Sequence, residues 1–302
     1  MTNDEVHRVS SFVIRHSSFM KILKTAASLR NWLAATTGKI VLVPTMGALH
    51  RGHGALITKA RKLAGPQGRV IVTIFVNPTQ FSPKEDLSRY PRPFAADAEM
   101  CRTLGADAIF HPAPEVLYPT GFSTYVEEHT VALGLCGASR PGHFRGVCTV
   151  VLKLFNLCRP DLAVFGLKDY QQCQVIARMV RDLHIPVRLI FAPTVREPSG
   201  LALSSRNIYL TAQERTEATA LRRGLLAARA AFGKGERSAH KLRALVAKTI
   251  AASPLARIDY IATVDATSLE HVATLKPGDT IALAVFFGTT RLIDTVQMGK
   301  GG

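Results

Sequence analysis

A short segment of the chain strongly constrains the fold. An apolar run at residues 40–43 leads into PTMGALHRGH at positions 44–53, and a helical pattern follows over residues 54–63. This order predicts a buried strand, a glycine-bearing turn and a helix. His50 and His53 stand three residues apart where the helix should begin, so both point to one side. Because a helix N-terminus favours anions, the pair predicts a site that grips phosphate and stabilises charge as a phosphoryl bond breaks. The alternative is a pair of surface histidines that cap the helix.

The wider pattern predicts an α/β fold with a parallel sheet covered on both faces. Short apolar strands are expected at residues 40–44, 70–76, 108–110, 162–165 and 188–191, with a further strand from Lys21. They alternate with helices expected at residues 54–63, 95–104, 147–157 and 169–183. Such sheets bind ligands at the carboxyl ends of their strands.

The composition changes after Pro193, where a smaller α+β domain is expected. Helices are predicted at residues 211–231 and 238–251, and strands at 258–264, 281–287 and 292–295. We therefore expect domains at residues 20–195 and 196–302, joined by a polar hinge at 196–201. Residues 1–19 resemble neither domain. We interpret them as a disordered extension, and we expect the natural start to be Met20.

Composition narrows the classes of function. The 302 residues carry 38 Lys and Arg against 22 Asp and Glu, a net charge of +16. The basic residues are dispersed and not interleaved with aromatic ones, which disfavours nucleic-acid binding and favours an anionic small substrate. No apolar run is long enough to span a membrane. The five cysteines lack metal-site spacing and are expected to be reduced, buried thiols of a cytoplasmic protein.

Two further polar segments follow predicted strands and could complete a phosphate site. Lys168 is placed to reach a phosphate, and Asp169 could cap the next helix or accept a ribose hydroxyl. Past the hinge, Ser204, Ser205 and Arg206 offer two hydroxyls and a guanidinium for phosphate oxygens on a mobile loop. Taken alone, that second segment is better explained as a helix cap with a surface arginine.

Other candidates are less specific. Gln80 and Gln172 suit the hydroxyl and carboxylate groups of a small polar substrate. Asp97, on a predicted helix, could hold Mg²⁺ or be a solvated carboxylate. The basic segment RPGHFRG at positions 140–146 could line an anion site, shape a dimer contact or form a structural turn.

Taken together, these segments resemble the pantothenate synthetases, a family of ATP-dependent pantoate–β-alanine ligases. The resemblance runs from Met20 to about Asp294. It is carried, in order, by PTMGALHRGH, FVNPTQF, RYPR, RPGHF, KDYQQ and GLALSSRN. It implies a Rossmann-like nucleotidylyltransferase domain, a smaller C-terminal lid and a homodimer.

The resemblance also implies a reaction. The pantoate carboxylate attacks the α-phosphate of Mg·ATP, which releases pyrophosphate and leaves pantoyl adenylate. The amine of β-alanine then attacks the acyl carbon to give pantothenate and AMP, on the route to coenzyme A. The nearest alternative is a ligase of the same superfamily with a different acid acceptor, and a more distant one is a basic nucleic-acid-binding protein.

Roles for individual residues follow from the same resemblance. Catalysis would involve His50, His53, Lys168 and Arg206, with His53 the expected proton donor. Pantoate and β-alanine would be bound by Gln80, Gln172 and Asn77, and Asp97 would lie on the metal side. The ATP site as a whole would comprise Met46, Gly47, His50, His53, Gly166, Lys168, Asp169, Val195, Leu203, Ser204, Ser205 and Arg206.

Two positions depart from the family pattern. Leu167 replaces the usual polar residue before Lys168, and Ser199 replaces an aspartate before Gly200. Neither change removes a residue with a direct catalytic role, so we expect activity to be retained.

Overall fold

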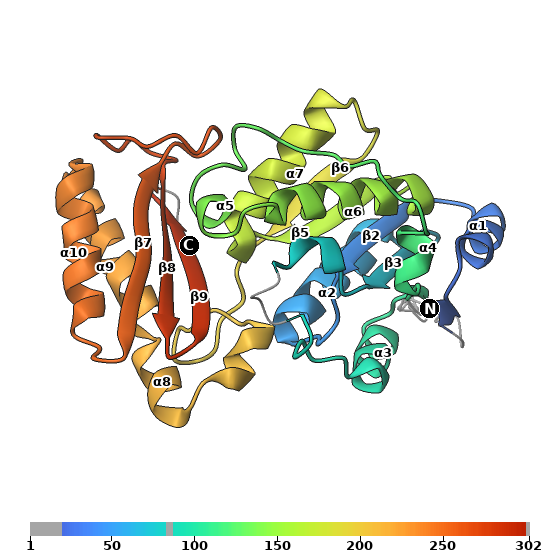
Figure 1. Cartoon of the computed structure of the whole chain (residues 1–302), viewed down its shortest axis with the longest axis horizontal. Helices are drawn as coiled ribbons and strands as arrows, with labels where there is room; N and C mark the ends of the chain where they lie inside the picture. The colour runs from blue at the N-terminus through green and yellow to red at the C-terminus, as the bar shows by residue number, and fades with distance from the viewer. Residues whose placement is uncertain (1–19, 83–86, 300–302) are drawn as a thin grey trace, which may run out of the picture.

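The structure is a computed structural model that describes residues 20–82 and 87–299. It contains two sheets, which lie side by side along the longest axis of the molecule (Figure 1). The expectations for residues 1–19 lie outside the described residues.

The larger sheet is parallel, as predicted. Its six strands follow the order β1-β4-β3-β2-β5-β6, which places β2 at the centre between β3 and β5. Strand β2 pairs with β3 over six residues, from Ile40 opposite Arg69 to Thr45 opposite Ile74. The strands are β1 (Lys21–Leu23), β2 (Ile40–Thr45), β3 (Arg69–Ile74), β4 (Ala108–Phe110), β5 (Leu162–Gly166) and β6 (Arg188–Ala192).

Helices cover both faces of this sheet because successive strand residues point to opposite sides. In β2, Val41 and Val43 pack in the cluster that contains Ile57 of α2. Leu42 packs instead in the cluster that contains Leu154 of α6. Helices α2 (Arg51–Ala64) and α3 (Phe94–Thr103) contribute to the first cluster, and α1 (Ala26–Ala34), α6 (His143–Cys158) and α7 (Tyr170–Asp182) contribute to the second.

Short elements complete this part of the chain. They are the helices α4 (Pro114–Leu117) and α5 (Cys136–Ser139) and the 3₁₀ turns η1 (Pro78–Gln80) and η2 (Leu167–Asp169). A third 3₁₀ turn, η3 (Ser205–Tyr209), follows in the C-terminal part of the chain. The predicted fold class, an α/β parallel sheet with a smaller α+β part, is therefore confirmed.

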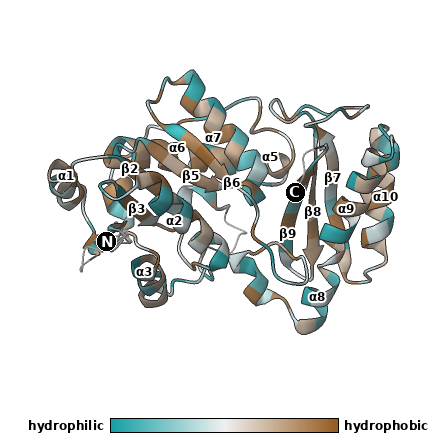
Figure 2. Ribbon diagram, turned by 180° about the vertical axis from the view of Figure 1, so that it is seen from behind, coloured by the Kyte–Doolittle hydropathy of each residue, from teal (hydrophilic) through white to brown (hydrophobic). Residues whose placement is uncertain are grey.

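Residues 196–299, here called the C-terminal unit, are built on an antiparallel sheet. Its strands are β7 (Ala256–Val264), β8 (Thr280–Phe287) and β9 (Thr290–Gln297), in the order β7-β8-β9. Strand β8 is hydrophobic along most of its length (Figure 2). Helices α9 (Ala220–Gly233) and α10 (Ala239–Ala251) cover one face and bury its apolar side chains. The other face lies toward the parallel sheet.

The prediction of a single helix at residues 211–231 is wrong, because the structure contains two helices in this region. Helix α8 (Ala212–Glu217) begins at Thr211, whose side chain accepts a hydrogen bond from the backbone of Glu214. The backbone then tightens, and the Thr219 N–H donates to the Thr216 carbonyl at 3.3 Å. The Thr219 hydroxyl donates to the same carbonyl at 2.7 Å. Such side-chain bonds compete with the helical ladder, so the helix stops and α9 starts afresh.

Two predictions about the whole chain can be compared with the described residues. All five cysteines are buried, and none forms a disulfide. Within residues 20–82 and 87–299, no helix has the length and apolar character needed to cross a bilayer.

Gly146 provides a test of how α6 positions the neighbouring turn η1. A β-carbon added at Gly146 would lie 2.4 Å from the Thr79 carbonyl oxygen and 2.6 Å from the Gln80 nitrogen. Because these are backbone atoms, we expect Gly146→Ala to destabilise the protein by about 1–3 kcal/mol, measured by urea unfolding. Gly233→Ala is the matched control, since nothing lies within 4 Å of its added β-carbon. Equal unfolding free energies for the two variants would contradict this packing.

Candidate active site

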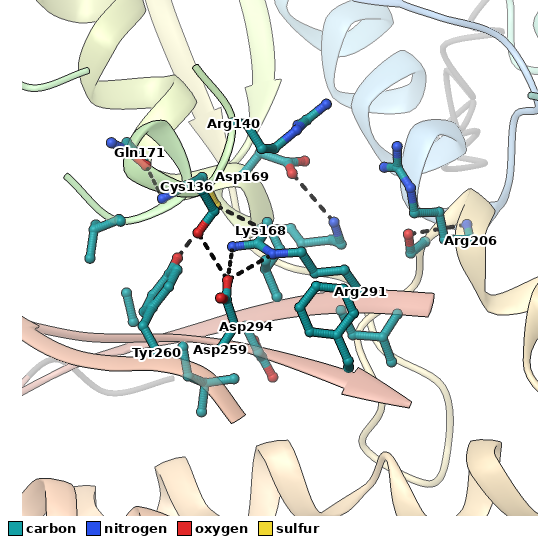
Figure 3. Close-up of a pocket in the computed structure, with 18 of the residues that line it drawn as sticks. Cys136, Arg140, Lys168, Asp169, Gln171, Arg206, Asp259, Tyr260, Arg291 and Asp294 are labelled. Carbon is teal, nitrogen blue, oxygen red and sulfur yellow. Dashed lines mark hydrogen bonds and ion pairs between the residues drawn. The ribbon is translucent and has the colours of Figure 1, made fainter. Parts of the chain in front are cut away.

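The predicted polar segments converge at the carboxyl ends of four parallel strands. They line an inner cavity of about 220 Å³, which contacts residues that follow β2, β3, β5 and β6. A second, outer cavity of about 1010 Å³ lies between the parallel sheet and the C-terminal unit (Figure 3). Both cavities are lined by Arg140, His143, Lys168, Asp169, Gln172, Ser204 and Arg206. These seven residues, here called the junction, form the wall that the two cavities share.

The turn after β2 has an unusual backbone. Gly47 and Ala48 both have positive φ angles, of 85° and 50°. The Asp97 carboxylate holds this turn, because its two oxygens accept hydrogen bonds from Ala48 N at 2.8 Å and Leu49 N at 2.7 Å. Asp97 is only 2% exposed. Burial raises the pKa of its carboxyl group, and the two N–H groups partly offset that rise.

The predicted role of Asp97 toward Mg²⁺, directly or through water, stays a prediction. Both carboxylate oxygens accept backbone hydrogen bonds, and Asp97 lines neither cavity. Among the described residues, no group of three or more His, Cys, Asp or Glu side chains could hold a metal ion. In the structure, Asp97 positions the turn that carries the histidines.

His50 and His53 lie at the start of α2. The Nδ1 atom of His50 accepts a hydrogen bond from Gly52 N at 3.1 Å. The Nδ1 atom of His53 accepts one from His50 N at 3.4 Å. Since Nδ1 is an acceptor in both rings, a neutral imidazole carries its proton on Nε2. The rings lie 4.2 Å apart and line the inner cavity, so the histidines cap the helix and also face a cavity, while phosphate binding stays a prediction.

The surroundings keep both histidines neutral. Burial, reinforced by the charge of Lys168, lowers the pKa of His50 from 6.5 to about 4. Burial, followed by the proximity of His50, lowers the pKa of His53 to about 3. At neutral pH the pair therefore presents N–H groups, which suit hydrogen bonds to phosphate oxygens.

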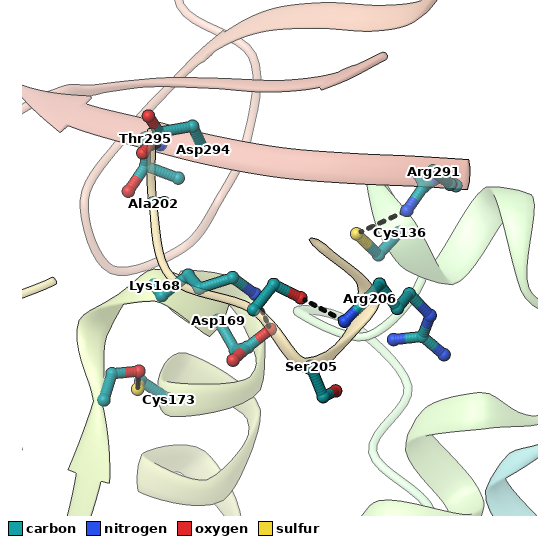
Figure 4. A network of polar contacts seen from close by, with 12 residues as sticks. Cys136, Lys168, Asp169, Cys173, Ala202, Ser205, Arg206, Arg291, Asp294 and Thr295 are labelled. Atoms are coloured by element: carbon teal, nitrogen blue, oxygen red, sulfur yellow. Dashed lines mark hydrogen bonds and ion pairs between the residues drawn. The ribbon is translucent and has the colours of Figure 1, made fainter. Parts of the chain in front are cut away.

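Lys168 and Asp169 lie in η2, directly after β5. Lys168 Nζ is 3.4 Å from Asp169 Oδ1 (Figure 4). Burial alone would raise the pKa of Asp169, but the charges of Lys168 and Arg206 lower it overall. The Asp169 side chain does not cap α7. The capping alternative for Asp169 is therefore not realised; its carboxylate lines both cavities, and its contact with a ribose hydroxyl stays a prediction.

The segment around Arg206 forms a loop against the same cavities. Ser204 Oγ accepts a hydrogen bond from Arg206 N at 3.2 Å and so caps η3. The Arg206 side chain lines both cavities rather than an open surface. At the base of the loop, Leu203 N donates to Val195 O at 3.0 Å. This contact brings Val195 and Leu203 together on the wall of the inner cavity.

Gln80 is held from two sides. Its Nε2 donates to Met46 Sδ at 2.9 Å, and its Oε1 accepts from Asn77 Nδ2 at 3.1 Å. Asn77, which is 1% exposed, also donates to the Gly146 carbonyl and accepts from Tyr118. These bonds make Asn77 a group that positions Gln80. Gln172 reaches both cavities from α7.

The structure accommodates both departures from the family pattern. Leu167 is partly buried against the main hydrophobic cluster, so an apolar side chain is tolerated there. Ser199 is exposed in the hinge, and its Oγ accepts a hydrogen bond from Leu201 N at 3.5 Å. Neither side chain lines a cavity.

Two arginines of the C-terminal unit make contacts that local sequence does not reveal, and one of these contacts, from Arg291 to Cys136, leaves the unit. Arg291 of β9 pairs with Asp259 of β7 at 2.7 Å and donates to Cys136 Sγ at 3.5 Å (Figures 3 and 4). Arg196 of the hinge forms two hydrogen bonds to Asp294 of β9, at 2.7 and 2.8 Å. The bonded residues come from different elements and are far apart in the chain, so no local pattern reveals them.

The fold is an α/β parallel sheet, and the ends of its strands carry a cavity lined by imidazole and basic side chains, an arrangement typical of enzymes that act on phosphorylated substrates. Residues 21–297 match the family model described as pantoate-beta-alanine ligase, and the chain belongs to this family. It is 53% identical over 284 residues to a pantothenate synthetase of Myxococcus xanthus, in a match that covers 92% of this chain and 96% of that protein. It is 51% identical over 282 residues to one of Moorella thermoacetica, with coverage of 92% and 99%.

Solved structures agree with this assignment. The pantothenate synthetase of Thermus thermophilus is 44% identical with a TM-score of 0.87, in a match that covers 92% of this chain and 99% of that one. The pantoate-beta-alanine ligase of Francisella tularensis, complexed with beta-gamma ATP and beta-alanine, is 35% identical with a TM-score of 0.76. That match covers 94% of this chain and 99% of the other.

The two histidines should make folding sensitive to acid. The unfolded imidazole has a pKa near 6.5, against about 4 for His50 and about 3 for His53 in the folded protein. Between pH 6.5 and 4 the unfolded chain therefore binds protons that the folded chain does not. The free energy of unfolding therefore decreases as the pH is lowered, by up to about 1.4 kcal/mol per pH unit for each histidine.

His53→Gln should make this decline shallower, because the new side chain binds no proton. The measurement is the urea midpoint between pH 7 and pH 5. The exposed His129 offers a matched control, and His129→Gln should keep the parent slope. Identical slopes for the parent and both variants would show that His53 is not a neutral, buried group.

Proposed function

We propose that the chain ligates pantoate and β-alanine to pantothenate through a pantoyl adenylate, with release of pyrophosphate and AMP. The main support is the convergence, on one inner cavity, of groups suited to phosphate with groups suited to a hydroxy acid. The family membership and the ATP and β-alanine bound by the Francisella tularensis relative support it further. The product would feed coenzyme A synthesis.

In the first step, a pantoate carboxylate oxygen bonds to the α-phosphorus of ATP, and the bond from that phosphorus to pyrophosphate breaks. Because an ionised carboxylate needs no deprotonation, the protein's task is positioning and charge stabilisation. The neutral Nε2–H groups of His50 and His53 would donate to phosphate oxygens as negative charge moves onto the leaving group. The expected role of His53 as a proton donor is thereby refined. Because the pKa of His53 is low, its ring is neutral and would donate a hydrogen bond rather than transfer a proton.

The other basic groups would hold the phosphate chain. Lys168 and Arg206 flank Asp169 at the junction, and Ser204 and Ser205 lie on the loop that carries Arg206. The remaining nucleotide contacts would come from five residues whose backbone or side chains line or adjoin the inner cavity: Met46, Gly47, Gly166, Val195 and Leu203. Asp169 and Gly166 would face the ribose.

Pantoate would lie between Gln80 and Gln172. Their amide groups can donate to a carboxylate and accept from hydroxyls, which pantoate offers in combination. Asn77 would act mainly through its hydrogen bond to Gln80. In the second step, the β-alanine nitrogen bonds to the acyl carbon, the bond from that carbon to the AMP oxygen breaks, and the amine releases a proton.

A lid movement of the C-terminal unit and a homodimer are expected from the family resemblance. The domain boundary at 195/196 is expected from the change in composition, and a cytoplasmic location from the free cysteines. Magnesium would arrive with the phosphates of ATP as part of the substrate, since the Asp97 carboxylate is committed to the backbone.

The direct test is product release. Purified protein with pantoate, β-alanine and Mg·ATP should form AMP and pyrophosphate in equal amounts through many turnovers. Without β-alanine, a single equivalent of pyrophosphate per site should appear and AMP should not accumulate. Sustained AMP release without β-alanine would indicate a ligase with another acceptor, and no AMP from folded protein would refute the proposal.

His53 can be tested in the same assay. His53→Ala removes an N–H donor at the phosphates and the acceptor for His50 N, so kcat should fall by at least about a hundredfold. His129→Ala, at an exposed histidine, should leave kcat unchanged. Near-normal turnover in His53→Ala would remove His53 from the mechanism.

A further inference from the structure

The basic segment at residues 140–146 remains without a role in the steps above. Its sequence is compatible with an anion site, a dimer contact or a turn. The structure places two of its side chains, Arg140 and His143, at the junction of the inner and outer cavities. Figure 3 shows Arg140 on the wall of the outer cavity together with Lys168 and Arg206.

Arg140 is tied to the backbone of Gln80. Its Nη1 lies 3.0 Å from His143 Nε2, and its Nη2 donates to the Gln80 carbonyl at 3.4 Å. A guanidinium can only donate, so His143 Nε2 accepts and His143 Nδ1 carries the proton. That Nδ1 lies 2.9 Å from the Gln80 carbonyl and donates to it. His143 is 8% exposed, so Arg140 rests on a buried support beside Gln80.

The three cations of the junction lie in two groups. Lys168 is 3.4 Å from Asp169, and the charge of Arg206 lowers the pKa of the same carboxyl group. Arg140 instead contacts His143 and Gln80. The proposed function assigns the first group to the phosphates of ATP and Gln80 to pantoate. Arg140 is therefore the junction cation on the acid side of the site.

β-Alanine needs a cation in that position. Its amine must reach the acyl carbon of the adenylate, and its carboxylate lies only two methylene groups away. An incoming molecule would pass from the outer cavity through the junction, so its amine would lead and its carboxylate would remain at the junction. A guanidinium binds a carboxylate with a planar fork of N–H groups, which a single amide cannot reproduce.

We propose that Arg140, supported by His143, binds the carboxylate of β-alanine and selects amines that carry an acid group. This inference rests on the proposed function and adds to it a determinant of specificity for the second substrate. The first step should not depend on this contact, because β-alanine takes no part in it.

The test compares two amines in Arg140→Gln. For β-alanine, kcat/KM should fall by about 10- to 100-fold, as expected for loss of a charge-assisted hydrogen bond. For β-alaninamide, which lacks the carboxylate, it should stay near the parent value. The single equivalent of pyrophosphate formed without β-alanine should also persist, which shows that the variant is folded and makes adenylate. Arg140→Lys keeps the charge but lacks the planar fork. Its kcat/KM for β-alanine should lie between the values of the parent and of Arg140→Gln.

Arg145→Gln is the matched control. Arg145 belongs to the same segment but is exposed, lies 4.9 Å from the Tyr125 ring and lines neither cavity. The Arg145→Gln variant should keep the preference of the parent protein for β-alanine over β-alaninamide. If Arg140→Gln and Arg140→Lys keep that preference while pyrophosphate still forms, the inference is overturned and the proposed function stands. If the parent forms no pyrophosphate, both are overturned.

Discussion

The site depends on one buried carboxylate that holds a strained turn. The chain must leave β2 and enter α2 within a few residues, and it does so through positive φ angles at Gly47 and Ala48. An alanine in that region costs energy unless its surroundings impose the conformation. Asp97 supplies this constraint by accepting the N–H groups of Ala48 and Leu49. The first turn of α2, and with it the direction of both histidine rings, follows from this arrangement.

The parallel sheet then brings the remaining groups to the same place. Parallel strands end at a common edge, so segments distant in the chain approach one another after β2, β3, β5 and β6. Their charges act on each other at short range. Burial and Lys168 keep His50 neutral, while Lys168 and Arg206 keep Asp169 ionised. The result is a site with neutral donors on one side and paired charges on the other.

The C-terminal unit closes this edge through a few polar contacts. Arg196 joins the hinge to β9 through the nearly buried Asp294, and Arg291 reaches Cys136 of α5. The intervening space stays open as a cavity of about 1010 Å³. Apolar packing joins the two parts as well, because Val264 and Ala282 of the C-terminal unit belong to the same buried cluster as Phe165 and Tyr170.

Much of this architecture could be predicted from local sequence. The central strands were expected to within about two residues, because a short run of buried apolar side chains between two helices is typical of a parallel strand. The prediction of one helix at 211–231 is wrong because the hydroxyls of Thr216 and Thr219 bond to backbone carbonyls, where the helical hydrogen-bond pattern ends. Helix α6 starts at His143 rather than near residue 147, after Gly142 in a left-handed conformation and without a side-chain cap. Helix ends depend on individual hydrogen bonds, and a periodic pattern does not specify them.

The sequence by itself determined which chemical groups stand at the strand ends and in what order, since apolar runs and turn residues are local properties. It could not assign Asp97, because the residues that Asp97 binds lie 48 and 49 positions earlier in the chain. The protonation of His50 and His53, the pairing of Arg140 with His143 and the junction of two cavities were decided only by tertiary structure. Each depends on burial and on contacts through space, which arise when distant segments pack together.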